Sequence, residues 1–140
     1  MKNPYVRFSP EEEEEIDLIY SRLADLQDGT VFPTIPQVAE LCYRISKSKG
    51  FWEEEKAARN KAEMIALMHS ELSEALETLR DDPHEVSQKA SGCTVLEEEM
   101  ADVIIRVLDF CHGFNLNLTK AIVRKMEYNF SRPYKYGKRF

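Results

Sequence analysis

The chain has 140 residues, of which 43% are hydrophobic and 31% are charged, a balance typical of one soluble globular domain. The formal net charge is −6, and no apolar run approaches the ~20 residues that cross a bilayer. Composition therefore excludes a disordered or membrane-spanning chain, and we expect a single domain over residues 1–140 with no membrane partner.

Charge is distributed unevenly along the sequence. Residues 120–140 contain seven basic residues and one acidic residue, whereas residues 1–119 contain 12 basic and 24 acidic residues. An acidic body repels a long polyanion, so we expect no long nucleic acid among the partners. The acidic part suits cations and the basic part suits a small anion, a division that a metal–phosphate complex would match.

The N-terminal residues and the cysteines bear on the cellular compartment. Residues 1–15 contain few apolar residues and end in five consecutive glutamates, so we expect no secretory signal peptide. Cys42, Cys93 and Cys111 are scattered and lack C-x-x-C spacing, which predicts neither a disulfide framework nor a zinc site. Together these features predict a cytoplasmic protein.

Helices are predicted along the whole chain, because Gly and Pro are few and Glu, Leu, Ala and Lys are many. Ser9-Pro10 followed by glutamates is typical of a helix start. Prolines, glycines and Asn115–Asn117 separate the later segments. The expected helices cover about residues 10–27, 37–46, 52–79, 95–114 and 119–131. With no repeat, strand alternation or clear linker, the sequence predicts one all-α domain.

The predicted third helix carries an apolar stripe and a pair of acids. At helical spacing, five apolar residues form a stripe that we expect to face the core: Ile65, Met68, Leu72, Leu76 and Leu79. A second line begins with apolar residues and ends in Glu71 and Glu74, one turn apart. An isolated charge at such a partly buried position is costly unless it is paired or bound to a metal.

The predicted fourth helix carries a second acidic pair. Glu99 and Asp102 lie one turn apart, and Arg106 and Asp109 continue their line. Taken alone, this line is typical of a solvated face. The opposite face is expected to pack in the core through Leu96, Met100, Val107, Cys111 and Phe114.

Together the two pairs predict a metal site. Antiparallel packing of the two helices would bring Glu71, Glu74, Glu99 and Asp102 to one place. Their mutual repulsion is strong at low dielectric, and a divalent cation offsets it. Ligands that are all oxygen favour Mg²⁺, with Mn²⁺ as a possible substitute. The alternative is two solvated acid pairs.

A di-iron site is the competing carboxylate site, and it requires Glu-x-x-His on two helices. Asp109 and His112 have that gap once only, and His69 precedes Glu71 rather than following it. The sequence therefore favours the Mg²⁺ site.

The predicted last helix carries basic residues. Lys125, Asn129 and Arg132 share one face. Lys and Arg suit phosphate oxygens, and Asn both donates and accepts hydrogen bonds. The pattern predicts a phosphate-binding group. The alternative is an exposed basic helix end that complements the helix dipole.

In order and spacing, these motifs resemble the MazG-like, all-α nucleoside triphosphate pyrophosphohydrolase superfamily. The family pattern is EExxE followed by ExxD, and residues 71–74 and 99–102 match its carboxylates, with Ser70 in place of the first acid. Residues 125–129 resemble the family's Lys-x-x-x-Asn. Residues 49–52 resemble the segment that brings an aromatic side chain to the nucleotide base.

The resemblance covers about residues 36–133 and leaves a basic-aromatic tail at 134–140 outside it. It implies a four-helix-bundle-like core in a homodimer or a dimer of dimers. It also implies Mg²⁺-dependent hydrolysis of (deoxy)nucleoside triphosphates to monophosphate and pyrophosphate, as house-cleaning of the nucleotide pool. The predicted first helix lies outside the resemblance and is expected as an extra N-terminal helix.

The resemblance also implies residue roles. Glu71 and Glu74 are expected to be catalytic as well as metal ligands, with Glu74 as the general base. Lys125, Asn129 and Arg132 are expected to bind phosphates. Arg106 either reaches the same phosphates or pairs with acids of its own helix.

Two residues are candidates for contacts with the base. Trp52, the only tryptophan, either stacks on the base or packs in the core, and Asn60 is expected to help recognise the base.

A second hypothesis is a non-catalytic helical module that senses nucleotides, and Ser70 and the unassigned tail favour it. An enzyme would release pyrophosphate, whereas a sensor would bind without turnover. A related enzyme on the same scaffold would give a different product pattern.

Overall fold

The computed structural model describes residues 9–27, 33–52, 59–133 and 137, which form five α-helices. In chain order these are α1 (Pro10–Gln27), α2 (Ile35–Ser48), α3 (Lys61–Asp81), α4 (Val95–Gly113) and α5 (Leu118–Phe130). The all-α prediction is confirmed, and none of the described helices is long and apolar enough to span a bilayer. Residues 134–136 and 138–140 of the predicted tail lie outside the described residues.

Capping side chains explain where the helices begin. Ser9 Oγ accepts from the backbone N–H of Glu12, as the sequence suggests, and Thr94 Oγ1 accepts from the backbone N–H of Glu97. The start of α3 differs from the predicted residue 52. The Asn60 side chain accepts from two backbone N–H groups and so caps the helix that begins at the next residue.

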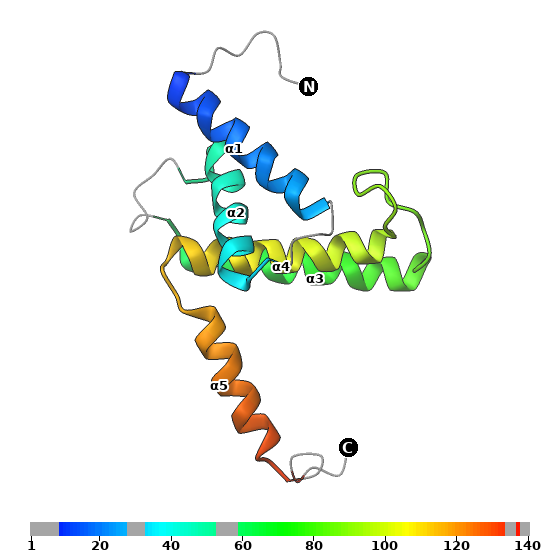
Figure 1. The fold of residues 1–140 in the computed structure, drawn as a ribbon. Coiled ribbons are helices and arrows are strands. Elements are labelled where there is room, and N and C mark those ends of the chain that lie inside the picture. The colour runs from blue at the N-terminus through cyan, green and yellow to red at the C-terminus, as the bar shows by residue number, and fades with distance from the viewer. Residues whose placement is uncertain (1–8, 28–32, 53–58, 134–136, 138–140) are drawn as a thin grey trace.

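The fold consists of a long helix pair, here called the α3–α4 arm, with α2 crossing it and α1 on α2. α3 and α4 form an antiparallel pair, α2 packs against α4, and α1 packs on α2 (Figure 1). The contact between α2 and α4 contains a small core of Ala39, Cys42 and Leu108, with Val38 and Leu118 packed against it. This arrangement places α2 against the C-terminal half of α4 (Figure 1).

α5 stands apart from this packed group. The chain leaves α4 through a turn in which Asn115 has a φ of 55°, a left-handed conformation that Asn tolerates well. From there α5 extends away from the α3–α4 pair (Figure 1), and no described residue of α5 is buried. Phe130 exposes 93% of its surface. Among the described helices, α1 to α4 therefore form the packed group, and α5 joins it through its first residue, Leu118.

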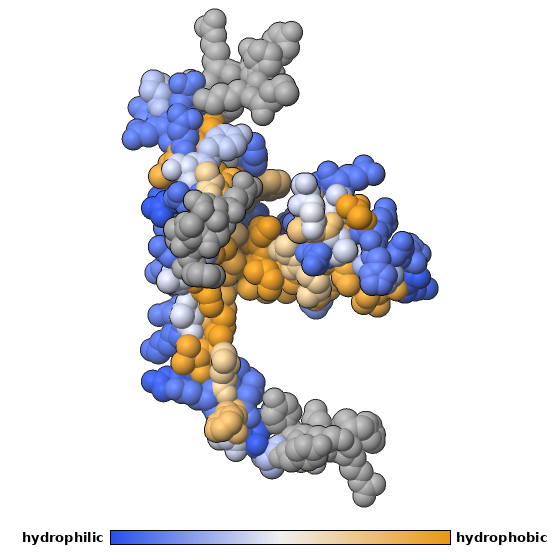
Figure 2. Space-filling model, turned by 45° about the vertical axis from the view of Figure 1, so that its right-hand side comes forward, coloured by the Kyte–Doolittle hydropathy of each residue, from blue (hydrophilic) through white to orange (hydrophobic). Residues whose placement is uncertain are grey.

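The burial of α3 and α4 differs from the prediction. Leu72, Leu76 and Leu79 of the expected core stripe are exposed, and Leu76 exposes 56% of its surface. On α4, Met100 is also exposed, whereas Glu99 is buried. The physical reason is that α2 packs on the acidic side of the pair and leaves the apolar side uncovered. Figure 2 shows this apolar surface along the α3–α4 arm and on the neighbouring side of α5.

Candidate metal centre and adjoining cleft

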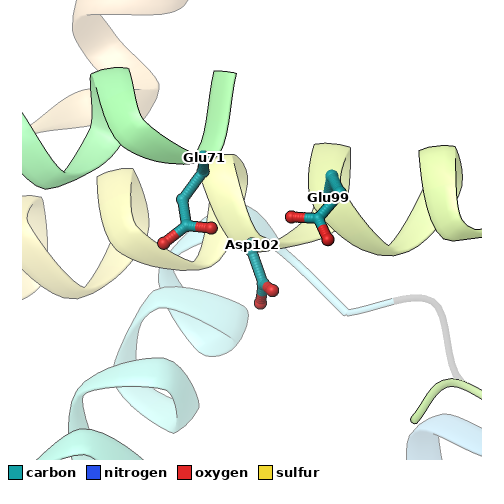
Figure 3. Close-up of side chains that lie close together, drawn as sticks. All are labelled: Glu71, Glu99 and Asp102. Carbon is teal, nitrogen blue, oxygen red and sulfur yellow. The ribbon is translucent and has the colours of Figure 1, made fainter. Parts of the chain in front are cut away.

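Three of the four predicted metal ligands converge. Glu71 projects from α3, and Glu99 and Asp102 project from α4 (Figure 3). One carboxylate oxygen from each residue lies within 4.8 Å of the others. Glu71 and Glu99 are buried and Asp102 is half-buried. The antiparallel packing of α3 on α4 brings these side chains together, as their spacing predicts.

Glu99 is the least compensated charge of this cluster. It is only 6% exposed, and no described residue gives it a hydrogen bond or an ion pair. Burial raises the pKa of Glu99, and the negative charges of Glu74 and Glu98 raise it further. The positive charge of Lys89 offsets these effects only in part. A buried carboxylate that forms no ion pair is unfavourable, and a bound cation would remove that cost.

Asp102 completes the set of oxygen donors. Burial raises the pKa of Asp102, and the charge of Glu71 adds to that effect. Three convergent carboxylates that supply only oxygen fit Mg²⁺ or Mn²⁺ better than they fit zinc or copper. By the chemistry of its donors, the cluster therefore fits the predicted ion.

The fourth predicted ligand, Glu74, is exposed and lies outside the group of three. Glu74 comes three residues after Glu71, so its side chain points about 60° away from that of Glu71 around the helix axis. Glu74 is nevertheless close enough to Glu99 for its charge to raise the pKa of that carboxyl group. It therefore lies beside the cluster rather than in it.

Arg106 joins the cluster through α3. Its Nε and Nη2 atoms each lie 2.5 Å from Oε1 of Glu71. The ion pair that forms is thus with Glu71 and not with Asp102 or Asp109, although the charge of Arg106 lowers the pKa of Asp102. The guanidinium partly neutralises Glu71, whereas Glu99 has no such partner among the described residues.

The loop between α3 and α4 contributes a basic residue, Lys89, that the sequence analysis did not single out. The loop folds back on itself, with the Ser87 N–H donating to the Cys93 carbonyl at 2.9 Å. Ser87 Oγ then donates to Glu98, and Lys89 Nζ lies 2.8 Å from Oε1 of the same carboxylate. The hydrogen bond from Lys89, followed by that from Ser87, lowers the pKa of Glu98. The polar residues of the loop before Glu97–Glu99 were the sequence signal that could have indicated these contacts.

A cleft of about 370 Å³ opens beside the cluster, between α2, α3 and α4. Glu71, Asp102 and Arg106 line it, and so does the buried Asp109, two turns further along α4. Its remaining walls are largely apolar, with Cys42, Ile45, Phe51, Met64, Leu67 and Ile105, and also include Ser46, Lys49 and Arg59. The cleft therefore joins the candidate metal centre to an apolar space.

The predicted base contacts are placed next to this cleft but do not line it. Trp52 is buried, and its indole Nε1 donates to Oδ1 of Asp109 at 2.8 Å. Its ring centroid lies 5.1 Å from that of Tyr43 and 5.5 Å from that of Phe114. This placement favours packing in the core, one of the two readings of Trp52, and Asn60 serves as the helix cap described above.

The predicted phosphate-binding residues do not meet the acidic cluster within one chain. Lys125, Asn129 and Arg132 lie on or just after α5, which extends away from the α3–α4 pair (Figure 1). Lys125 Nζ lies 4.8 Å from the ring centre of Tyr128. Their separation follows from the turn at Asn115, which directs α5 outward.

The described site thus combines three carboxylates and a guanidinium from two antiparallel helices with a cleft that a third helix completes. Comparison of the chain with protein-family models, curated proteins and solved structures finds no match.

Proposed function

We propose that this protein is a Mg²⁺-dependent nucleoside triphosphate pyrophosphohydrolase that converts (deoxy)nucleoside triphosphates to monophosphate and pyrophosphate. The observation that carries the proposal is the buried carboxylate of Glu99, which lacks a partner among the described residues and lies within 4.8 Å of Glu71 and Asp102. The mixed walls of the adjoining cleft suit a ligand with charged phosphates and a flat, apolar base. The sequence motifs support the same assignment.

In this proposal Glu71, Glu99 and Asp102 hold Mg²⁺, which when bound neutralises phosphate charge and polarises a phosphorus–oxygen bond. Glu74, beside the cluster, accepts a proton from the attacking water. The water oxygen bonds to the α-phosphorus, the bond from that phosphorus to the bridging oxygen breaks, and pyrophosphate leaves with the electron pair. When substrate binds, Arg106 gives up its ion pair with Glu71 and binds a phosphate oxygen instead, a ligand that suits its planar guanidinium.

We also propose that the active form is a homodimer or a dimer of dimers. The uncovered apolar stripe on α3 and the exposed apolar residues of α5 are two surfaces that a second copy of the chain would cover. α5 extends away from the acidic cluster of its own chain, so in this proposal Lys125, Asn129 and Arg132 serve the cluster of the other copy.

The test is a turnover panel with Mg²⁺ and each common (deoxy)nucleoside triphosphate, with products separated by chromatography. We expect monophosphate and pyrophosphate, and a loss of about 100-fold or more in kcat for Glu99→Gln. Glu77→Gln, an exposed glutamate on α3, is the matched control and should keep full activity. Diphosphate and phosphate as products would overturn the proposed cleavage position.

A non-catalytic nucleotide-sensing module is the second candidate. It is favoured by the separation of the basic residues of α5 from the acidic cluster within one chain. Nucleotide binding without any turnover, by the wild-type protein with Mg²⁺ or Mn²⁺, would select this candidate over the enzyme.

A further inference from the structure

The cleft contains a second buried carboxylate that the metal cluster does not use. Asp109 is 7% exposed and lines the cleft together with Asp102. Seven residues separate the two along α4, which corresponds to ~10 Å along the helix axis. That span resembles the reach from the 5′ phosphate of an extended nucleotide to the far edge of its base.

Two hydrogen bonds hold the carboxylate of Asp109 in place. Trp52 Nε1 donates to Oδ1 at 2.8 Å, and Ser46 Oγ donates to Oδ2 at 3.1 Å. A carboxylate oxygen accepts about two hydrogen bonds, so each oxygen keeps one position for a further donor. Burial raises the pKa of Asp109, while the hydrogen bonds from Trp52 and Ser46 lower it. The arrangement presents two acceptors side by side in a fixed orientation.

The walls between the two carboxylate positions suit an aromatic ring. Ile45 of α2, Met64 and Leu67 of α3, and Ile105 of α4 line the same cleft. Apolar side chains of this kind bury the faces of a planar heterocycle, and a few fixed polar groups then select among heterocycles of similar size. Asp109, two turns along α4 from Asp102, is a buried polar group in a position to make that selection.

We propose that Asp109 is the specificity-determining residue of the site and that it selects guanine nucleotides. Guanine presents a ring N–H and an exocyclic amino group side by side, which matches two carboxylate oxygens that each have one position free. Adenine and cytosine place a ring acceptor beside their amino group, and thymine places carbonyl oxygens on both sides of its ring N–H. Each of these bases would set a lone pair against the carboxylate.

This inference rests on the proposed function, because it requires the phosphates to lie at the acidic cluster. The first test therefore uses the wild-type protein and measures kcat/KM for dGTP, dITP, dATP, dCTP and dTTP with Mg²⁺. Hypoxanthine in dITP lacks only the exocyclic amino group of guanine. We expect dGTP to exceed dITP by about 10-fold or more, since a hydrogen bond to a charged group is lost. Equal values for dGTP and dITP would overturn the inference.

The second test is Asp109→Asn, which keeps one oxygen for the bond from Trp52 and replaces the other by a donor. We expect kcat/KM for dGTP to fall by about 10- to 100-fold, mainly through KM, while that for dTTP is kept or rises. If Asp109 had only a structural role, the substitution would lower kcat/KM for all substrates by the same factor. Asp81→Asn, exposed at the end of α3, is the control and should leave the ranking unchanged.

The outcomes separate this inference from the proposed function. Turnover with an unchanged ranking of bases in Asp109→Asn overturns the inference and leaves the proposed function standing. If no triphosphate is hydrolysed, the proposed function fails, and binding of dGMP and dIMP is compared through the fluorescence of Trp52, the only tryptophan. Tighter binding of dGMP then supports the guanine subsite, and equal or absent binding overturns it.

Discussion

The burial of Glu99 destabilises the fold when its carboxyl group is charged and no metal is bound. Its raised pKa means that the folded chain holds this proton more tightly than the unfolded chain does. The contribution of Glu99 to stability is therefore largest below its unfolded pKa, and it declines as pH rises through the raised folded pKa. At neutral pH the charged form is a cost to folding, and such costs are common where residues are kept for binding.

We expect Glu99→Gln to raise the melting temperature of the metal-free protein at pH 7. Removal of the uncompensated charge should add about 1 kcal/mol, or ~3 °C for a chain of this length. The same change should abolish the increase in melting temperature on addition of Mg²⁺. Thermal denaturation followed by circular dichroism measures both effects, and Glu77→Gln should change neither. A lower melting temperature for metal-free Glu99→Gln would contradict the interpretation of Glu99 as an uncompensated charge.

The same pKa shifts predict how pH would control the proposed binding of Mg²⁺. Burial raises the pKa of both Glu99 and Asp102, so protons compete with Mg²⁺ for these carboxylates at acidic pH. We expect the affinity for Mg²⁺ to increase as pH rises from 5 to 7.5, with protons released on binding. Isothermal titration calorimetry in buffers of different ionisation enthalpy measures both quantities. An affinity that does not change over this range would count against these two ligands.

Among the helices, the packing at the C-terminal end of α4 depends on a glycine, Gly113. Gly113 is buried at the end of α4, where a Cβ atom would overlap the ring of Trp52. That ring is held by its bond to Asp109 and by contacts with Tyr43 and Phe114. The absence of a side chain at 113 therefore allows α4 and the segment after α2 to approach closely.

We expect Gly113→Ala to destabilise the fold by about 2 kcal/mol, because it overpacks this contact. The direction is informative, since Gly→Ala within a helix ordinarily stabilises by about 1 kcal/mol. Urea denaturation measures the change, and a shift in Trp52 emission would report the displaced ring. Ser70→Ala, at an exposed position of α3, is the control and should be nearly neutral. An increase in stability for Gly113→Ala would show that the ring moves away without cost.

At the scale of the whole molecule, the chain leaves a large apolar surface uncovered. The stripe on α3 lies on the face that α4 leaves uncovered, and the apolar residues of α5, Val123, Met126, Tyr128 and Phe130, are exposed as well (Figure 2). Exposed apolar area of this kind on several elements is characteristic of a surface that another chain covers.

We expect the wild-type protein to be a dimer or larger and Leu76→Glu to shift it toward monomer. A charge placed in the centre of an apolar interface is costly to bury, so the dissociation constant should rise by about 10-fold or more. Sedimentation equilibrium measures the change. Val86→Glu, on the exposed loop before α4, is the control and should leave the assembly unaltered. A monomeric wild-type protein over the accessible concentration range would refute the proposed assembly.

Local sequence pattern accounts for most of the helices and for the membership of the acidic cluster. Helix propensity, capping residues and periodic spacing act over a few residues, so most helix positions, though not the start of α3, and the Glu-x-x-Asp pair of α4 followed from local pattern. The convergence of Glu71 with Glu99 and Asp102 needed only antiparallel neighbours, which a short connection between two long helices favours.

Which side of the α3–α4 pair is covered depends on contacts between residues far apart in the sequence. The bonds of Arg106 to Glu71, Trp52 to Asp109 and Ser46 to Asp109 span 35, 57 and 63 residues, beyond the range of any local pattern. They depend on the packing of α2 against the acidic side of the pair, and this is why the predicted apolar core stripe of α3 is exposed while Asp109 is buried in the cleft.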